Sequence, residues 1–76
     1  MKVYVAVCLD HHQDPVIHVY GTAENANADA KAFAESNAGA FGCPPEYFSE
    51  KVANGLYSCH YCEGDSAYVI EQEMNA

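Results

Sequence analysis

The chain has 76 residues, and its 11 acidic residues against three lysines give a formal net charge of -8. So short a chain predicts a single domain over residues 1–76 with a thin core. The acidic balance argues against direct nucleic-acid binding, because affinity for phosphate comes mainly from Lys and Arg. It favours a protein partner with a basic surface.

Membrane association is also not expected, since no stretch approaches the ~20 apolar residues that a membrane helix needs. The N-terminal residues enter an alternating pattern at once and lack the apolar core of a signal peptide. We therefore predict a cytoplasmic protein that does not bind membranes. In a reducing compartment the four cysteines are expected to be free thiols or metal ligands rather than disulfides.

The first part of the chain predicts a β-hairpin. Residues 2–9 alternate as a strand does, and the polar residues 10–15 end in a proline, which is typical of a loop. Residues 16–20 are β-branched and aromatic and predict a second strand, antiparallel to the first. The apolar face of the first strand would consist of Val3, Val5, Val7 and Leu9.

Thr22 is a suitable N-cap for a helix, and Glu24 in its first turn suits the helix dipole. Alanines recur at helical spacing together with Phe33, and residues 37–39 give a natural stop. After Pro44-Pro45, residues 46–53 predict a second, short helix that ends at Asn54-Gly55.

Residues 56–62 and 66–73 predict a second hairpin, turning on Gly64-Asp65. The expected fold is therefore α+β, an antiparallel sheet of about four strands in ββα(α)ββ order with one main helix packed on one face. We expect the helix to cover the face with the greatest apolar area. That face would contain Val3, Val5, Val7, Ile17, Val19, Tyr57, Cys59, Tyr61 and Ile70.

A zinc site is one alternative that the sequence leaves open, although no cofactor is expected. Cys59 and Cys62 form a C-x-x-C pair, and His11 and His12 lie together in the first loop; cysteine and histidine are the ligands that zinc prefers. Residues three apart on a strand point to opposite faces, so the two sulfurs could meet at one metal only if the backbone kinks. No nucleophile has a base and an oxyanion site beside it, so no catalytic residue is predicted.

The predicted partner-binding residues lie in the last hairpin. Glu71 and Glu73 are two apart on a strand and point the same way, and His60 would join them in a polar patch. The full set of predicted partner-binding residues is His60, Glu63, Asp65, Glu71 and Glu73.

The order of these segments resembles small uncharacterised proteins of bacteriophages and other mobile elements. The segments that carry the resemblance are Lys2-Val3-Tyr4-Val5, Asp10-His11-His12, the N-capped helix and the closing hairpin from Tyr57-Ser58 through Glu63-Gly64-Asp65-Ser66 to Val69. The resemblance implies a setting of mobile DNA and no particular activity.

We therefore predict a non-enzymatic protein that acts by protein-protein contact. An inhibitor of a nucleic-acid-binding or host-defence protein, similar to anti-CRISPR proteins, would suit the charge. The alternatives are the zinc-stabilised domain, an enzyme of unknown type, and a homodimer that completes its own fold.

Overall fold

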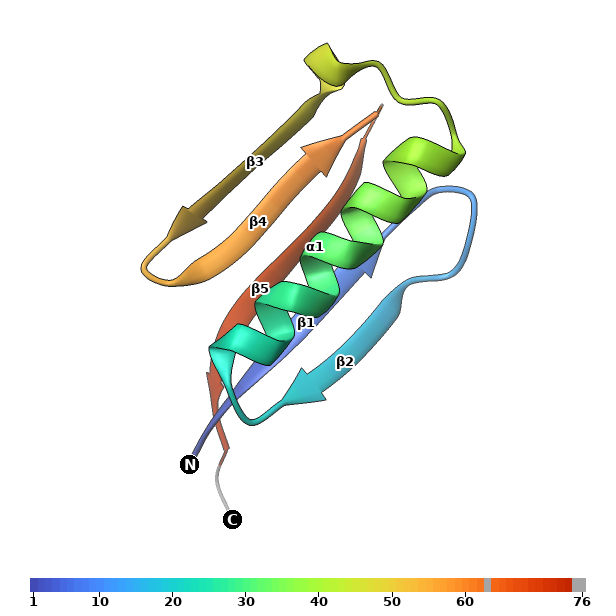
Figure 1. Ribbon diagram of the computed structural model, residues 1–76. Helices are drawn as coiled ribbons and strands as arrows, with labels where there is room; N and C mark the ends of the chain where they lie inside the picture. Colours follow the sequence, from blue (N-terminus) through green and yellow to red (C-terminus); the bar gives the residue numbers. More distant parts are fainter. Residues whose placement is uncertain (63, 75–76) are drawn as a thin grey trace.

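The computed structural model describes residues 1–62 and 64–74. Within these residues one α-helix packs on one face of a five-stranded antiparallel sheet with strand order β2-β1-β5-β4-β3 (Figure 1). The predicted α+β class is confirmed, with one strand more than expected. The elements are β1 (Lys2–Leu9), β2 (Val16–Tyr20), α1 (Ala23–Ala40), the 3-10 helix η1 (Pro45–Tyr47), β3 (Phe48–Ala53), β4 (Leu56–Tyr61) and β5 (Asp65–Glu73).

The strands from the two ends of the chain, β1 and β5, are neighbours in the middle of the sheet. They pair antiparallel from Lys2 opposite Glu73 to Leu9 opposite Ser66. The β1-β2 hairpin is as predicted and places β2 at one edge of the sheet, while β3 forms the other edge. Helix α1 lies along the direction of the strands, over the middle of the sheet, and packs mainly on β5, β1 and β4 (Figure 1).

The prediction of a helix over residues 46–53 is wrong beyond its first turn. The chain makes one 3-10 turn after Pro44 and then continues as strand β3, which pairs with β4. Asn54 and Gly55 both have positive φ, 55° and 76°. This is the two-residue hairpin turn that Asn-Gly favours, because its twist matches that of the flanking strands. Asn54-Gly55 therefore joins two strands rather than ending a helix.

The predicted register of the β4-β5 hairpin is also wrong. Tyr61 pairs with Asp65 and Cys59 pairs with Ala67, so the loop between the strands ends at Gly64, and Asp65 belongs to β5 rather than to the expected two-residue Gly64-Asp65 turn. Cys62 and Gly64 have positive φ in this loop, 51° and 86°. The expected turn would place Tyr61 opposite Tyr68, three residues further along β5, and a shift by an odd number of residues exchanges the two faces of a strand, since strand side chains alternate. Ala67 and Val69 face the helix instead of Tyr68 and Ile70.

Small side chains form the contact between helix and sheet. The alanines of one helical stripe, spaced four residues apart, are buried against alanine and cysteine side chains of the sheet. Side chains of this size let the helix lie close to the sheet, where many weak contacts add up. The buried apolar residues are Ala6, Cys8, Ala26, Ala30, Ala34, Ala38, Tyr57, Cys59, Tyr61, Ala67 and Val69.

The helix covers the opposite face of β1 and β2 from the one we predicted. Val3, Val5 and Val7 alternate with the buried Ala6 and Cys8, so they point away from the helix. Apolar area alone is a poor guide here, because the alanine stripe brings the helix close to the sheet, and Ala6 and Cys8 fit the narrow space under it better than the valines of β1 would. Ile17, Val19 and Ile70 likewise lie on the uncovered face and are 60%, 60% and 38% exposed, whereas the predicted burial of Tyr57, Cys59 and Tyr61 is confirmed.

Three side-chain hydrogen bonds cap the helix and tie it to the sheet. As predicted, Thr22 is the N-cap, and its hydroxyl accepts a hydrogen bond from the Asn25 N–H. Asn27 ties the helix to the β3-β4 hairpin: its amide donates to the Gly55 carbonyl at 2.8 Å and accepts from the Tyr57 N–H at 3.0 Å. The edge hairpin is therefore held by side-chain hydrogen bonds as well as by packing. In the described part of the chain no helix has the length and apolar character needed to cross a membrane.

Replacing Ala30, which is fully buried under the helix, by leucine should destabilise the protein by about 1–3 kcal/mol, because the close contact has no room for the added carbons. Ala32→Leu is the matched control, since Ala32 is exposed on the same helix and leucine has nearly the same helix propensity. Urea unfolding of both variants measures the difference. Equal effects at the two positions would show that the helix does not depend on close packing.

Candidate functional site

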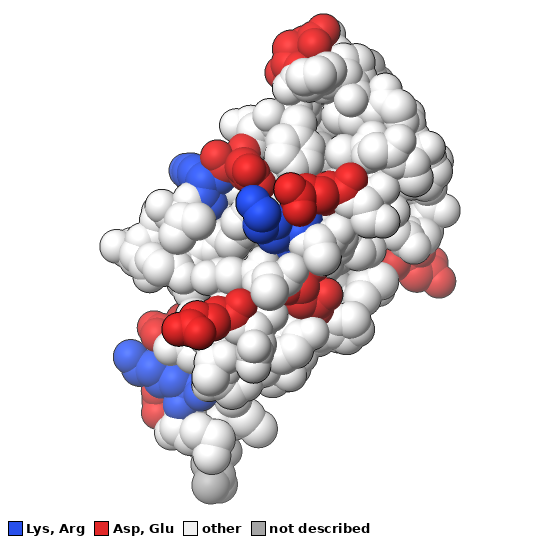
Figure 2. Space-filling view, in the orientation of Figure 1, with Lys and Arg blue, Asp and Glu red and all other residues white. Residues whose placement is uncertain are grey.

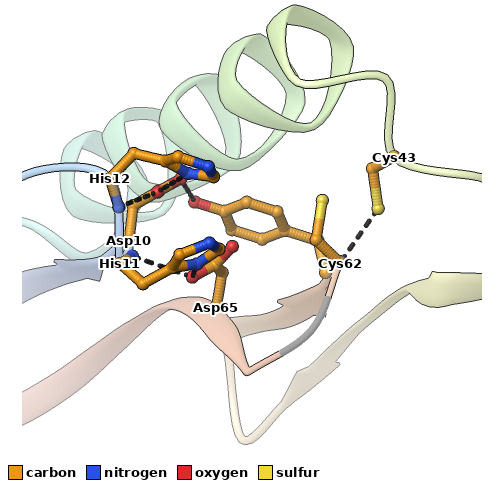
Figure 3. Close-up of polar contacts among 7 residues, drawn as sticks. Asp10, His11, His12, Cys43, Cys62 and Asp65 are labelled. Atoms are coloured by element: carbon orange, nitrogen blue, oxygen red, sulfur yellow. Dashed lines mark hydrogen bonds and ion pairs between the residues drawn. The ribbon is translucent and has the colours of Figure 1, made fainter.

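Two aspartates and two histidines meet at one end of the molecule. Asp10 and the two histidines belong to the loop that follows β1, and Asp65 is the first residue of β5 (Figure 3). A ring nitrogen of each histidine and a carboxylate oxygen of each aspartate all lie within 4.8 Å of one another. We call Asp10, His11, His12 and Asp65 the Asp-His cluster.

Each histidine of the cluster holds one carboxylate in the same way. The His11 N–H donates to Asp65 Oδ1 at 3.0 Å, and His11 Nδ1 lies 2.8 Å from the same oxygen. The His12 N–H donates to Asp10 Oδ1 at 2.9 Å, and His12 Nδ1 is again 2.8 Å away. The carboxylates are buried while both rings are partly exposed, so the histidines separate two buried carboxylates from solvent.

Asp10 is held by a third donor. The buried Tyr61 hydroxyl donates to Asp10 Oδ2 at 2.9 Å. Burial by itself would raise the pKa of Asp10, but the hydrogen bonds from the His12 N–H, the His12 ring and Tyr61 outweigh it and hold the pKa below its usual value. Asp10 is therefore ionised at neutral pH although it is only 4% exposed.

The other carboxylate is less well satisfied. Asp65 is 1% exposed, and its Oδ2 has no hydrogen-bond partner within the described residues, although it is buried. A buried polar atom of this kind costs free energy unless something binds it. The rings above it are positioned by stacking, since His12 lies parallel to Phe41 with ring centroids 3.9 Å apart and also contacts the His11 ring.

The predicted zinc ligands are only partly brought together. His11 and His12 join the cluster, but with Asp10 and Asp65 rather than with Cys59 and Cys62. Neither aspartate was predicted as a ligand. The sequence signal that was available is the Asp-His-His run of the first loop. Nothing in the sequence indicated Asp65 as a metal ligand, because only the fold brings β5 to that loop.

The cysteines occupy two different environments. Cys8 and Cys59 are buried beneath the helix. Cys43 lies beside Cys62 in the loops at the end of the sheet, and its sulfur accepts a hydrogen bond from the Cys62 N–H at 2.8 Å (Figure 3). Burial raises the pKa of Cys8 to about 11, and burial together with Cys43 raises the pKa of Cys62 to about 12. Raised thiol pKa values make these two cysteines poor nucleophiles.

The predicted partner-binding residues are spread over the molecule. Glu71 lies near Tyr4 and Lys2, and Glu73 forms an ion pair with the N-terminal amine, all on the helix side of the sheet. His60 is on the opposite face, between the buried Cys59 and Tyr61 of β4. Asp65 is buried in the cluster, and Glu63 lies outside the described residues. They therefore do not form one patch.

The face of the sheet that the helix does not cover is a second candidate site, after the Asp-His cluster. Its centre is apolar and partly or largely exposed, and the strand registers place it over β2, β1 and β5. Among the described residues no acidic side chain points from a strand to this face, and the one lysine there, Lys51, is on the edge strand β3. We call Val3, Val5, Val7, Leu9, Ile17, Val19, Tyr68 and Ile70 the open face.

The charged side chains gather on the helix side instead. Figure 2 shows lysines and acidic residues side by side over the helix and the strand ends. Lys31 lies between Glu35 and Glu50, with nitrogen-oxygen distances of 3.9 and 3.6 Å, and Lys2 is 3.5 Å from Glu71. Both lysines are thus partly neutralised by neighbouring acids, so the helix side keeps a net negative charge.

A groove of about 400 Å³ lies between the helix and β3, lined by Asn27, Ala28, Lys31, Glu50, Lys51, Val52 and Tyr57. Its polar groups already bind one another: Glu50 accepts from the Tyr57 hydroxyl at 2.7 Å and is 3.6 Å from Lys31. The groove thus offers a ligand few polar groups to bind.

The chain matches no family model, no curated protein and no solved structure.

Removing the Tyr61 hydroxyl tests how the cluster is held. In Tyr61→Phe, Asp10 Oδ2 stays buried but loses its donor, which should cost about 1–3 kcal/mol of stability and raise the pKa of Asp10. Urea unfolding and NMR titration of the Asp10 carboxyl measure the two effects. Tyr47→Phe, at an exposed tyrosine of η1 outside both the cluster and the sheet faces, should change neither. An unchanged Asp10 pKa in Tyr61→Phe would show that the hydroxyl does not hold the carboxylate.

Proposed function

We propose that the protein is a non-enzymatic binding protein that works as a homodimer, with the open faces of two sheets packed against each other. One observation carries the proposal: in a chain of charge -8, the sheet face that the helix leaves uncovered has an apolar centre and, in the described residues, no acidic side chain. Exposed apolar surface of this extent is rare on monomeric proteins and marks an interaction site.

The thin core of the monomer gives a reason for such an interface. Among the described residues, Val69 is the only buried aliphatic side chain that is larger than alanine. Most of the other large aliphatic residues of the sheet (Val3, Val5, Val7, Leu9, Ile17, Val19 and Ile70) are on the open face, where a monomer leaves them partly in water. Covering them would add the burial that a domain of this size otherwise lacks.

A second copy of the chain fits the open face in area and in charge. Together with the neighbouring β4 and β3, the open face belongs to a sheet surface of five strands about 4.8 Å apart, each of roughly seven residues at about 3.3 Å, which gives roughly 550 Å² in projection. The accessible area of its side chains is larger and comparable to the ~800 Å² per partner of a stable interface. Two such faces can meet around a two-fold axis without opposing carboxylates, whereas the acidic helix sides of two copies would repel each other.

The dimer would keep both helices on the outside, and with them most of the negative charge. This arrangement presents two acidic surfaces to a partner with a basic surface, and steering by opposite charge would speed their encounter. Nucleic-acid-binding proteins have such surfaces, so inhibition of a protein of that class, including a host-defence protein, is the function that we propose for the dimer.

The chemistry of the thiols supports a non-enzymatic role. The raised pKa values of Cys8 and Cys62 leave them protonated at neutral pH, and a protonated thiol is a weak nucleophile. Cys59 also has a raised pKa, because it is buried under the helix. Three of the four cysteines thus have raised thiol pKa values, which make them unsuited to covalent catalysis.

The subunit count tests the dimer. Analytical ultracentrifugation and native mass spectrometry should find the wild-type protein dimeric, and Val19→Glu should weaken dimerisation by more than about tenfold, since it places two carboxylates in an apolar contact. Val52→Glu is the matched control: Val52 is 65% exposed, as against 60% for Val19, but belongs to the helix side of edge strand β3. Both positions are exposed in the monomer, so circular dichroism should show both variants folded.

Two results would contradict the dimer. One is a wild-type monomer at the highest concentration at which the protein stays soluble. The other is a dimer that Val19→Glu leaves intact or that Val52→Glu disrupts, because either would place the contact at an edge strand or on the helix side.

The acidic outer surface makes a separate prediction. A basic partner captured from lysate at low salt should be released as the ionic strength rises, because exposed charges are screened within about 10 Å at 0.1 M salt. Capture should also weaken in a variant that changes both Glu71 and Glu73 to glutamine, whereas changing the uncharged Gln72 to alanine should have no effect. Capture that is insensitive to both salt and these substitutions would show that charge does not recruit the partner.

A further inference from the structure

The Asp-His cluster contains an atom that the protein itself does not satisfy. Asp65 Oδ2 is buried and has no hydrogen-bond partner in the described residues, while Asp65 Oδ1 accepts from the His11 backbone and lies beside the His11 ring. A second carboxylate, that of Asp10, is buried nearby, and its Oδ2 accepts a hydrogen bond from the Tyr61 hydroxyl. Two adjacent buried carboxylates with an oxygen left over are an environment that a cation stabilises.

The distances suit a single metal ion. Zinc binds histidine nitrogen at about 2.0–2.1 Å and carboxylate oxygen at about 2.0–2.2 Å, which places tetrahedral ligands roughly 3.4 Å apart. The four ligand atoms of the cluster already lie within 4.8 Å of one another. The histidine side chains are 59% and 41% exposed, so small movements of the two rings at the surface can bring the atoms to bonding distance.

The types of ligand select the class of metal. Carboxylate and water oxygens suit Mg²⁺ and Ca²⁺, whereas imidazole nitrogen suits zinc and its neighbours in the first transition row. Two imidazoles with two carboxylates therefore favour a divalent transition-metal ion. We propose that Asp10, His11, His12 and Asp65 form a binding site for one such ion per chain, with Zn²⁺ as the reference ligand.

Hydrogen bonds around the cluster support this role. Metal sites are typically surrounded by partners that orient the ligands, and here the Tyr61 hydroxyl binds Asp10 Oδ2 while the two histidine N–H groups bind the Oδ1 atoms. Stacking on Phe41 fixes the plane of the His12 ring. The ligands are thus held in place before an ion arrives, which lowers the entropic cost of binding.

The site is distinct from the proposed dimer contact. Asp10 and Asp65 continue the alternation of Cys8 and Ala67, so they lie on the helix side of the sheet, away from the open face. Ion binding and dimerisation can therefore succeed or fail separately. The ion would cross-link the loop after β1 to the start of β5, and thereby stabilise the folded state.

Titration with Zn²⁺ and Co²⁺ tests the proposal, using chelator-treated full-length protein. Isothermal titration calorimetry and native mass spectrometry should find one zinc ion per chain, and Ca²⁺ should not compete. His12→Gln removes one ligand at a partly exposed position and should weaken binding by more than about tenfold. Asp65→Asn should do the same, and if that variant does not fold, His12→Gln alone decides.

His18→Gln is the matched control, because His18 forms another histidine-aspartate pair with Asp29, at 2.6 Å, away from the cluster. It should bind zinc as the wild type does. The absorption of the cobalt protein identifies the ligands: the cluster predicts a tetrahedral spectrum without a thiolate-to-metal charge-transfer band. No zinc binding by the wild type, equal binding by His12→Gln, or a charge-transfer band that is lost in Cys43→Ser would each overturn the proposal, the last by placing the ion on the cysteines.

Discussion

The close contact between an alanine helix and a sheet of small side chains is the constraint on which the rest of the structure depends. Four alanines of α1 meet alanine and cysteine residues of β1, β4 and β5, and no larger set of side chains would allow the same approach. This contact decides which face of the sheet is covered. Most of the larger aliphatic residues of the sheet (Val3, Val5, Val7, Leu9, Ile17, Val19 and Ile70) are consequently left on the other face, and the open face is a direct result of how the helix packs.

The same contact shapes the polar end of the molecule. With Ala6 and Cys8 beneath the helix, strand alternation carries Asp10 inward, and the β4-β5 register carries Asp65 to the same side. Tyr61 then fills the space beside them and binds Asp10. The protein thus buries two carboxylates near the end of its core, where histidines from a surface loop can reach them.

These two features give the molecule two separate sides. One side carries the helix, nearly all of the charge and the Asp-His cluster, and the other carries the open face. A dimer that joins the apolar sides would leave the charged sides accessible, so the proposed partner surface and the proposed ion site remain available in the assembly. The negative charge that argues against nucleic acid as a ligand is the same charge that would recruit a basic protein in the proposed function.

The sequence by itself determined the elements whose signals are local. Alternation predicted β1, turn chemistry predicted the proline-bounded loop and β2, and Thr22 marked the start of the helix, because each of these signals depends on neighbouring residues.

Only the tertiary structure decided the rest. The fit of the alanine stripe decided which face of the sheet is buried. Residues 48–53 became a fifth strand because they pair with β4. The register of β5 depended on the length of the loop before it, which the alternation of the strands does not specify. Asp65 reached the histidines because β1 and β5, from opposite ends of the chain, pair in the middle of the sheet. Contacts between residues more than fifty positions apart leave no mark in a local pattern, and for that reason the Asp-His cluster could not be predicted from the sequence.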